Sequence, residues 1–237
     1  MGPTELAIPS LLELMREDGA NPKEGRPLAI ERIWAANMIS NEQRLAILDE
    51  WREERRRMRN AHAINEMEAE QLELDRRMRR AGVPDTLISV SLDMTAAEAL
   101  RRGEWIYAHS TDSEAATRRG CMALKAWLKA EEFGMAAFVR STTALSAFRE
   151  NGDGAALRLQ SVGMLLLTGL GTEAATDWAV SQLCDLLDTR ALNGLPTIVT
   201  SVCKPDELAA HLSSRGNSGA AFAIVNLIRN HAVLVEA

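Results

Sequence analysis

Few residues of this chain combine the types and the spacing that chemistry requires. The first group is His109, followed by Asp112 and Glu114. An imidazole beside two carboxylates can bind a metal ion or exchange protons with a substrate. A histidine in a loop beside surface carboxylates is more often simply solvated, so we expect neither a catalytic role nor a metal site here.

The second group is Glu173 and Asp177, which follow Thr172. We expect Thr172 to cap a helix that begins at this point. Negative side chains in the first turn of a helix interact favourably with its dipole. We therefore interpret both acids as helix-start residues and not as catalysts.

The most informative stretch runs from Met164 to Glu173, where an apolar strand breaks into Gly-x-Gly-Thr-Glu before a helix. In nucleotide hydrolases such a strand ends in acidic residues that hold Mg²⁺ and polarise water. Thr168 and Gly169 occupy those places here. The strand, turn and helix are those of a catalytic strand, but the acidic side chains that would perform the chemistry are missing.

Composition limits the kinds of protein that this chain can be. Its 237 residues suffice for one main domain with an extension. Ala, Leu, Arg and Glu are abundant while Gly and Pro are sparse, which favours helices over an all-β fold. A net charge of −6 argues against a surface devoted to nucleic acid, although local basic patches remain compatible with it.

The cysteines are far apart and show no paired spacing, so the sequence predicts neither a disulfide framework nor a zinc knuckle. We expect Cys121, Cys184 and Cys203 to be small buried side chains and not nucleophiles. No apolar run approaches the length that spans a bilayer, and residues 1–19 lack the basic-then-apolar order of a signal peptide. We therefore expect a soluble cytoplasmic protein.

The elements that position these residues fall into two groups. Short helices are expected at residues 9–17 and 28–37, and a charged segment without Pro or Gly predicts one long helix, or two in line, over 41–81. Few apolar residues recur at helical spacing in this segment, so we expect the helix to project into solvent or to pack on a partner.

From Trp105 onward, short apolar strands alternate with helices, which is typical of a doubly wound parallel α/β sheet. The expected strands are 105–109, 136–141, 163–168, 195–202 and 232–235, and the expected helices are 113–132, 142–150, 173–190, 205–212 and 219–230. Because ligands bind at the carboxyl ends of such strands, chemistry is expected in the loops after Tyr107, Leu167 and Thr200.

Several short sequence motifs, most of them in the second half of the chain, resemble those of a known family. They are Arg80-Ala81-Gly82-Val83-Pro84, Leu170-Gly171-Thr172-Glu173 with Trp178-Ala179, Gly194-Leu195-Pro196-Thr197-Ile198-Val199-Thr200-Ser201 and Pro205-Asp206-Glu207-Leu208. From Arg79 onward the chain resembles the AAA+ ATPases of the bacterial helicase-loader and transposition-helper group (DnaC, DnaI and IstB type). The resemblance implies a P-loop NTPase-like three-layer α/β domain with a parallel five-stranded sheet over 83–237, after a helical N-terminal extension over 1–82.

The resemblance also locates the phosphate-binding loop, which in this family is a Gly-rich turn ending in Gly-Lys-Thr/Ser. The equivalent residues 108–115 contain no Gly and no Lys, and the degenerate positions are Ala108, Ser113, Glu114 and Ala115. Glu114 stands at the Lys position and would repel a triphosphate by on the order of several kcal/mol if the pocket is poorly solvated. Ser113 replaces a Gly whose backbone freedom permits close approach.

Other positions that the family uses for catalysis are also changed. Thr168 and Gly169 stand at the metal-binding and water-polarising positions, Val202 at the polar sensor, and Leu227 at the arginine that reaches a neighbour's nucleotide. The family's catalytic residues are missing at all of these positions, while the apolar pattern of the core is intact. This combination indicates that the fold was kept without nucleotide turnover, whether by evolution or by redesign.

The expected long helix carries the candidates for partner binding. Its basic runs (Arg52, Arg55, Arg56, Arg57, Arg59 and Arg76, Arg77, Arg79, Arg80) flank an acidic stretch (Glu66, Glu68, Glu70, Glu73, Asp75). This pattern fits a solvated, self-compensating helix. It also fits a surface that contacts a partner or single-stranded DNA, and the resemblance adds support to this second reading because helicase loaders grip the helicase through an N-terminal helical extension. The partner-binding candidates are Leu48, Trp51, Arg55 and Arg56.

The sequence thus predicts a non-enzymatic, helicase-loader-like interaction module in DNA replication or mobile-element biology, without a cofactor. Its expected partner is a replicative helicase, a transposase or an active AAA+ paralogue, with self-association and single-stranded DNA left open and no membrane. One alternative is a loader or transposition helper that binds ATP and magnesium weakly through an atypical phosphate loop. Another is a structural helical adaptor whose α/β domain only keeps it soluble.

Overall fold

The structure, a computed structural model, describes residues 41–131, 134–213 and 218–237, without the side chains of 41–45, 47 and 48. The chain divides into two units, Met1–Glu70 and Gln71–Ala237, and each is described by itself. The helices expected at 9–17 and 28–37 lie outside the described residues.

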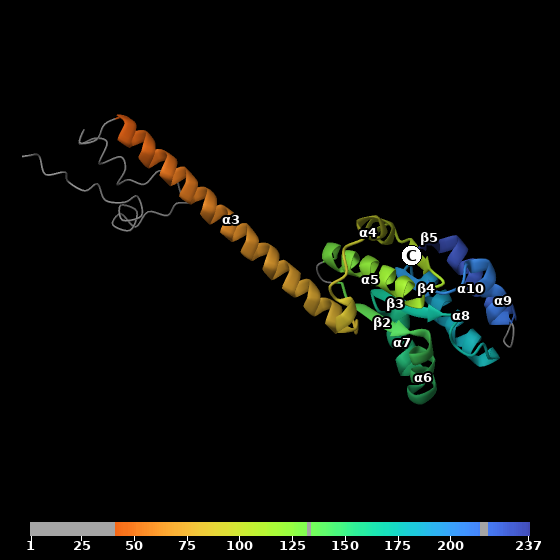
Figure 1. The fold of residues 1–237 in the computed structure, drawn as a ribbon. Helices are drawn as coiled ribbons and strands as arrows, with labels where there is room; N and C mark the ends of the chain where they lie inside the picture. The colour runs from red at the N-terminus through yellow and green to blue at the C-terminus, as the bar shows by residue number, and fades with distance from the viewer. Residues whose placement is uncertain (1–40, 132–133, 214–217) are drawn as a thin grey trace, which may run out of the picture. The chain divides into compact units, whose positions relative to one another are not determined.

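The long charged helix is confirmed as α3, Asn41–Arg80 (Figure 1). Exposed pairs one turn apart, such as Arg52 with Asp49 at 2.9 Å, support it by a few tenths of a kcal/mol each, about what such pairs contribute to isolated helices. At its end Gly82 has φ of +91°, and the Val83 amide donates to the Met78 carbonyl, as in a glycine-terminated helix.

The five expected strands are confirmed and form one parallel sheet in the order β2-β3-β4-β1-β5. The strands are β1 (Trp105–His109), β2 (Ala136–Arg140), β3 (Met164–Leu170), β4 (Thr197–Ser201) and β5 (Ala232–Glu236). β1 lies inside the sheet between β4 and β5, so its carboxyl end opens onto the loops where ligands bind in such folds.

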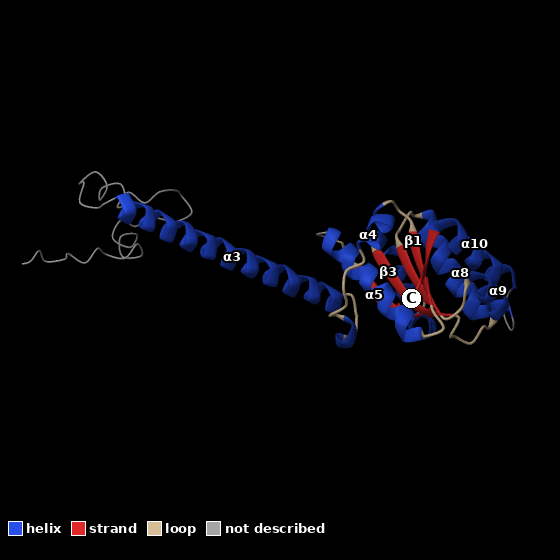
Figure 2. Ribbon diagram, turned by 45° about the horizontal axis from the view of Figure 1, so that its top comes forward, coloured by secondary structure: helices blue, strands red, loops and turns tan. Residues whose placement is uncertain are grey.

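Helices cover both faces of the sheet (Figure 2). Those of the second unit are α4 (Met94–Arg101), α5 (Ser113–Ala130), α6 (Ser141–Asn151), α7 (Asp153–Ser161), α8 (Asp177–Leu192), α9 (Pro205–Ser213) and α10 (Ser218–His231), with a short 3₁₀ helix at Asp85–Leu87. α4, α5 and the last turns of α3 pack on one face, and α6, α8, α9 and α10 pack on the other. This is the three-layer arrangement that the sequence predicted.

Side-chain alternation along the strands separates the two cores. Trp105 and Tyr107 face the core under α8 and α10, whereas Ile106 faces the core under α5. α5 approaches the sheet closely at Gly120, where an added Cβ would lie 2.7 Å from the Thr200 methyl group. The helix that follows the candidate phosphate loop is therefore held tightly against β4.

Some expected boundaries are wrong. The helix expected at 173–190 begins at Asp177, and its cap is Thr176, whose hydroxyl accepts from the Ala179 amide at 3.3 Å. Thr172 is not the cap, and Glu173 precedes the helix. The sequence reasoning also missed α4, α7 and the 3₁₀ helix. Within the described residues, no helix combines the length and the apolarity that a bilayer crossing needs.

Candidate nucleotide site

The loop between β1 and α5 is short and internally bonded. It consists of Ser110, Thr111 and Asp112. The Ser110 amide donates to the Ser201 carbonyl at 3.2 Å, and the Asp112 amide donates to the Ser110 hydroxyl at the same distance. The loop is thus attached to the end of β4 and does not form a wide Gly-rich turn.

Asp112 occupies the amino end of α5. Its carboxylate accepts a hydrogen bond from the Glu114 amide at 2.8 Å, the geometry of a helix N-cap. Helix amino ends bind anions because their first amides lack partners and the helix dipole is positive there. In this chain a carboxylate already fills that role.

Glu114 does not lie in the poorly solvated pocket that a strong repulsion of triphosphate would require. Its side chain is 73% exposed and pairs with Arg118 at 3.0 Å. Water screens such a group, so the repulsion expected from a poorly solvated pocket does not arise at this residue. Asp112 is the better-placed carboxylate, because it bonds directly to the helix amide.

The end of β3 carries a backbone irregularity at the expected metal position. The register between β3 and β4 shifts between Leu167 and Leu170, and Gly169 has φ of +71°. The Gly169 amide donates to the Thr200 hydroxyl at 3.2 Å, and its carbonyl accepts from the Thr172 hydroxyl at 2.7 Å. Thr168 is buried beside it. The backbone here favours glycine and offers no acidic side chain.

Glu173 is the acidic side chain that the structure brings to this edge, and it is 5% exposed. The Gly171 amide lies 3.0 Å from both of its carboxylate oxygens, and the Ser141 hydroxyl lies 2.7 Å from Oε2. These contacts connect the start of α6 with the loop after β3. Glu173 therefore has a buried structural role, and the expected helix-dipole role was wrong.

The other two positions that the sequence resemblance assigned to nucleotide contacts are apolar. Val202 follows β4, and Leu227 on α10 packs against the core with Val225 and Ile228. Neither can act as a polar sensor or as an arginine. Arg229 lies two residues beyond Leu227 and pairs with Asp206 of α9.

His109 ends β1 without joining Asp112 and Glu114 in a site. It lines an open pocket of about 470 Å³ together with Lys204, Arg229 and Glu236 among others. In the described ranges, no three His, Cys, Asp or Glu side chains are arranged to hold a metal ion.

The cysteines do not have the properties of nucleophiles. Burial raises the pKa of the Cys121 thiol to about 12, and burial also raises the pKa of Cys184 and Cys203. Cys121 is fully buried, as expected, whereas the other two are half-buried. Neutral thiols react slowly, because the thiolate is the nucleophile.

Among the partner-binding candidates on α3, Trp51 and Arg55 interact with each other. The Arg55 guanidinium lies 5.1 Å from the centroid of the Trp51 ring, within cation–π range. Arg56 is exposed, and the Leu48 side chain lies outside the described residues. Apolar side chains farther along, Met58, Ile64 and Met67, are also exposed, from 40% to 69%.

Comparisons with known proteins give a fold. Neither the protein-family models nor the curated proteins contain a match. Among solved structures, DnaI is 20% identical with a TM-score of 0.52, covering 65% of this chain and 90% of its own. A putative primosome component from Streptococcus pyogenes serotype M3 is 15% identical with a TM-score of 0.51, covering 69% and 94%.

The DnaC helicase loader gives a TM-score of 0.49 at 18% identity, over 60% of this chain and 85% of its own. Identities this low establish the fold alone. The likeness to DnaI and to the primosome component agrees with the strand order and the layers described above. The α/β part of this chain therefore has the fold of DnaI and of the primosome component, which agrees with the fold that the sequence resemblance implied.

Proposed function

We propose that this protein is a helicase-loader-like protein that has lost ATP binding and hydrolysis and acts as a protein-interaction module. The setting is DNA replication or mobile-element biology, and the partner is a replicative helicase, a transposase or an active AAA+ paralogue. One of the similar solved structures is itself named as a putative primosome component. The chain retains the AAA+ frame while the positions that would handle nucleotide are filled by other contacts.

The observation that carries the proposal is the Asp112 cap on α5. A nucleotide phosphate bound there would have to displace the Asp112 carboxylate from the Glu114 amide. The carboxylate belongs to the same chain and is always present at this position, whereas ATP would have to be recruited from solution. A displaced Asp112 would also remain close to the phosphates and repel them.

The end of β3 supports the same conclusion independently. A Mg²⁺ ion in nucleotide hydrolases needs acidic or hydroxyl ligands near the transferred phosphate. The Gly169 carbonyl and amide are both bonded to neighbouring side chains, and Glu173, the acid at this edge, is buried and bonded to Gly171 and Ser141. Magnesium would find no free carboxylate among these residues.

The interaction role is supported by α3 within the first unit. Trp51 with Arg55, and the exposed Met58, Ile64 and Met67, give this helix apolar surface that a solvated helix does not need. Large aromatic and arginine side chains are the residues that dominate protein contacts. Stacking platforms for single-stranded DNA would require more aromatic side chains than Trp51 supplies.

Two measurements test the proposal. Thermal unfolding with and without millimolar Mg-ATP tests nucleotide binding, since a ligand at a hundredfold excess over its Kd stabilises a fold by about 2.7 kcal/mol. We expect no shift, and a shift of several degrees would support the weak ATP-binding alternative. Capture of a purified helicase or AAA+ paralogue by the full chain, compared with a chain lacking residues 1–70, tests the interaction role, because Leu74 and Met78 at the end of α3 belong to the core and are kept. Equal capture by both would place the contact outside residues 1–70.

A further inference from the structure

The outer edge of the sheet, at β2, is incompletely covered. β2 is half-buried over residues 136–139 and exposed at Arg140, whereas β3 beside it is almost entirely buried. α7, which lies near this edge, has no fully buried residue. Ala155 and Leu159 of α7 are partly buried apolar side chains that pack against the core. This corner of the fold therefore presents apolar surface that its own helices do not cover.

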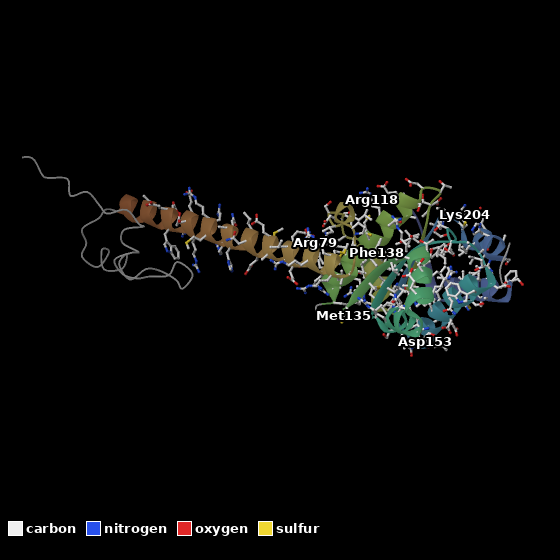
Figure 3. All side chains as sticks on the ribbon, turned by 90° about the horizontal axis from the view of Figure 1, so that it is seen from below. Arg79, Arg118, Met135, Phe138, Asp153 and Lys204 are labelled. Carbon is white, nitrogen blue, oxygen red and sulfur yellow. The ribbon has the colours of Figure 1, made fainter. Side chains whose placement is uncertain are left out.

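A pocket of about 380 Å³ lies at this corner, among the turn after α3, strand β2, and helices α6 and α7. Figure 3 labels Phe138 of β2, which contributes to its lining, and Asp153 at the start of α7. The apolar lining is dominated by alanines, namely Ala81, Ala136, Ala137, Ala144, Ala147 and Ala155. Because alanine side chains are short, the space between these elements stays open.

The charged side chains that line this pocket are all positive. Its lining, all within the described residues, includes Arg80 and Arg158 and no Asp or Glu. Arg158 is exposed, and the Arg80 side chain is 76% exposed and lies 3.9 Å from the Glu73 carboxylate. A second pocket of about 380 Å³ shares Arg80, Ala81 and Ala136 with the first. Glu73 and Arg77 line the second pocket, so the charges there are mixed. The first pocket, whose charged lining residues are Arg80 and Arg158, is called the β2 groove below.

The backbone of β2 leaves little room for an added strand. The Phe138 amide donates to the Ala81 carbonyl at 2.7 Å, and a Cβ on Gly82 would lie 3.4 Å from the Phe138 carbonyl. The turn after α3 therefore covers the middle of this edge. An occupant would enter the groove through side chains and not through backbone pairing with β2.

We infer that this β2 groove binds an acidic peptide segment of a partner protein, which inserts an apolar side chain between α6 and α7 while its carboxylates face Arg80 and Arg158. The apolar lining supplies the burial, and the arginines select acidic over basic sequences. Thr143 and Asn151, which also line the groove, can hydrogen-bond the peptide backbone. This inference rests on the proposed interaction role and concerns no nucleotide.

The test uses the full chain and fluorescently labelled octapeptides of defined composition. The first peptide has two central leucines flanked by Asp and Glu, the second has Lys in place of every acid, and the third has serines in place of the leucines. We expect saturable binding of the first peptide, at least about tenfold tighter than of either other, and weakening as salt is added.

Two substitutions with matched controls locate the binding. Ala147→Phe fills the groove from α6, whereas Ser146→Phe places the same ring on the adjacent, exposed residue, outside the lining. Arg158→Glu reverses a rim charge, whereas Arg101→Glu makes the same change on α4. We expect about a tenfold loss for Ala147→Phe and for Arg158→Glu, and none for the controls. Thermal unfolding confirms that each variant is folded.

Three results would overturn the inference. They are no saturable binding of the leucine-containing acidic peptide, equal binding of the lysine peptide, or binding that is unchanged in Arg158→Glu. Tighter binding of a single-stranded oligonucleotide, lost in Arg158→Glu, would instead assign the groove to nucleic acid. Because the titration contains no ATP, its failure would leave the proposed loss of ATP binding unaffected.

Discussion

The Asp112 carboxylate accepts a hydrogen bond from the Glu114 amide at 2.8 Å and so occupies the amino end of α5, where an active P-loop protein holds phosphate. Replacing Asp112 by Ala removes the cap. The free energy of unfolding should fall by about 1 kcal/mol, because helix caps contribute that much. Urea unfolding measures the change, and Thr111→Ala in the same exposed loop is the control. A loss no larger than that of the control would show that the cap contributes nothing.

Glu114→Lys alone should not restore hydrolysis. The substitution supplies the family's lysine and leaves Asp112 on the helix, no Gly turn and no metal ligand. Residues that act as one catalytic unit are strongly non-additive. Phosphate release from ATP measures the outcome, with an active DnaC-type loader as the positive control. Measurable turnover by the single variant would mean that residues 108–115 are not the phosphate loop.

Gly169→Glu, which restores an acid at the water-polarising position, should destabilise the fold. Gly169 has φ of +71°, and a Cβ there would lie 3.1 Å from the Thr172 hydroxyl oxygen. A side chain in the left-handed region costs about 1–2 kcal/mol. Gly154→Ala on α7, where an added Cβ meets nothing within 4 Å, should be neutral or stabilising. Equal effects of the two substitutions in urea unfolding would contradict the strain at Gly169.

Substituting Leu48→Ala and Trp51→Ala together should weaken self-association or partner capture and leave the α/β domain folded. Trp51 is half-buried beneath Arg55, and large aromatic side chains dominate such contacts. Sedimentation and pulldown measure association, and Met58→Ala on the same helix serves as a milder comparison. If association is unchanged while the melting temperature falls sharply, the segment is ordinary core.

The strands were predictable because their signals are local. Residues 105–107 alternate between the two cores, and the strand at 105–109 was predicted with its bounds correct. The start of α8 was not predictable, because Thr172-Glu173 and Thr176-Asp177 present the same local signal of a Thr followed by an acid. The deciding contact is tertiary. Glu173 bonds to Ser141, which lies 32 residues earlier in the chain.

α7 was missed for a related reason. It begins directly after Gly152, and Gly154 follows in its first turn, so that the sequence resembles a loop. At the candidate site, the sequence indicated which family residues were absent and did not indicate what replaced them. The cap by Asp112 and the irregular backbone at Gly169 depend on how β1, β3 and β4 meet at one edge.

Calorimetric titration of the wild-type protein with Mg-ATP tests the central claim most directly, because it detects binding without requiring hydrolysis. An active DnaC-type loader titrated in the same buffer is the positive control. We predict no saturable heat up to millimolar ATP, since the amino end of α5 is already bonded to Asp112 and the end of β3 offers no free acid. Saturable binding in the low micromolar range would contradict the account and would favour an ATP-binding loader with an atypical phosphate loop.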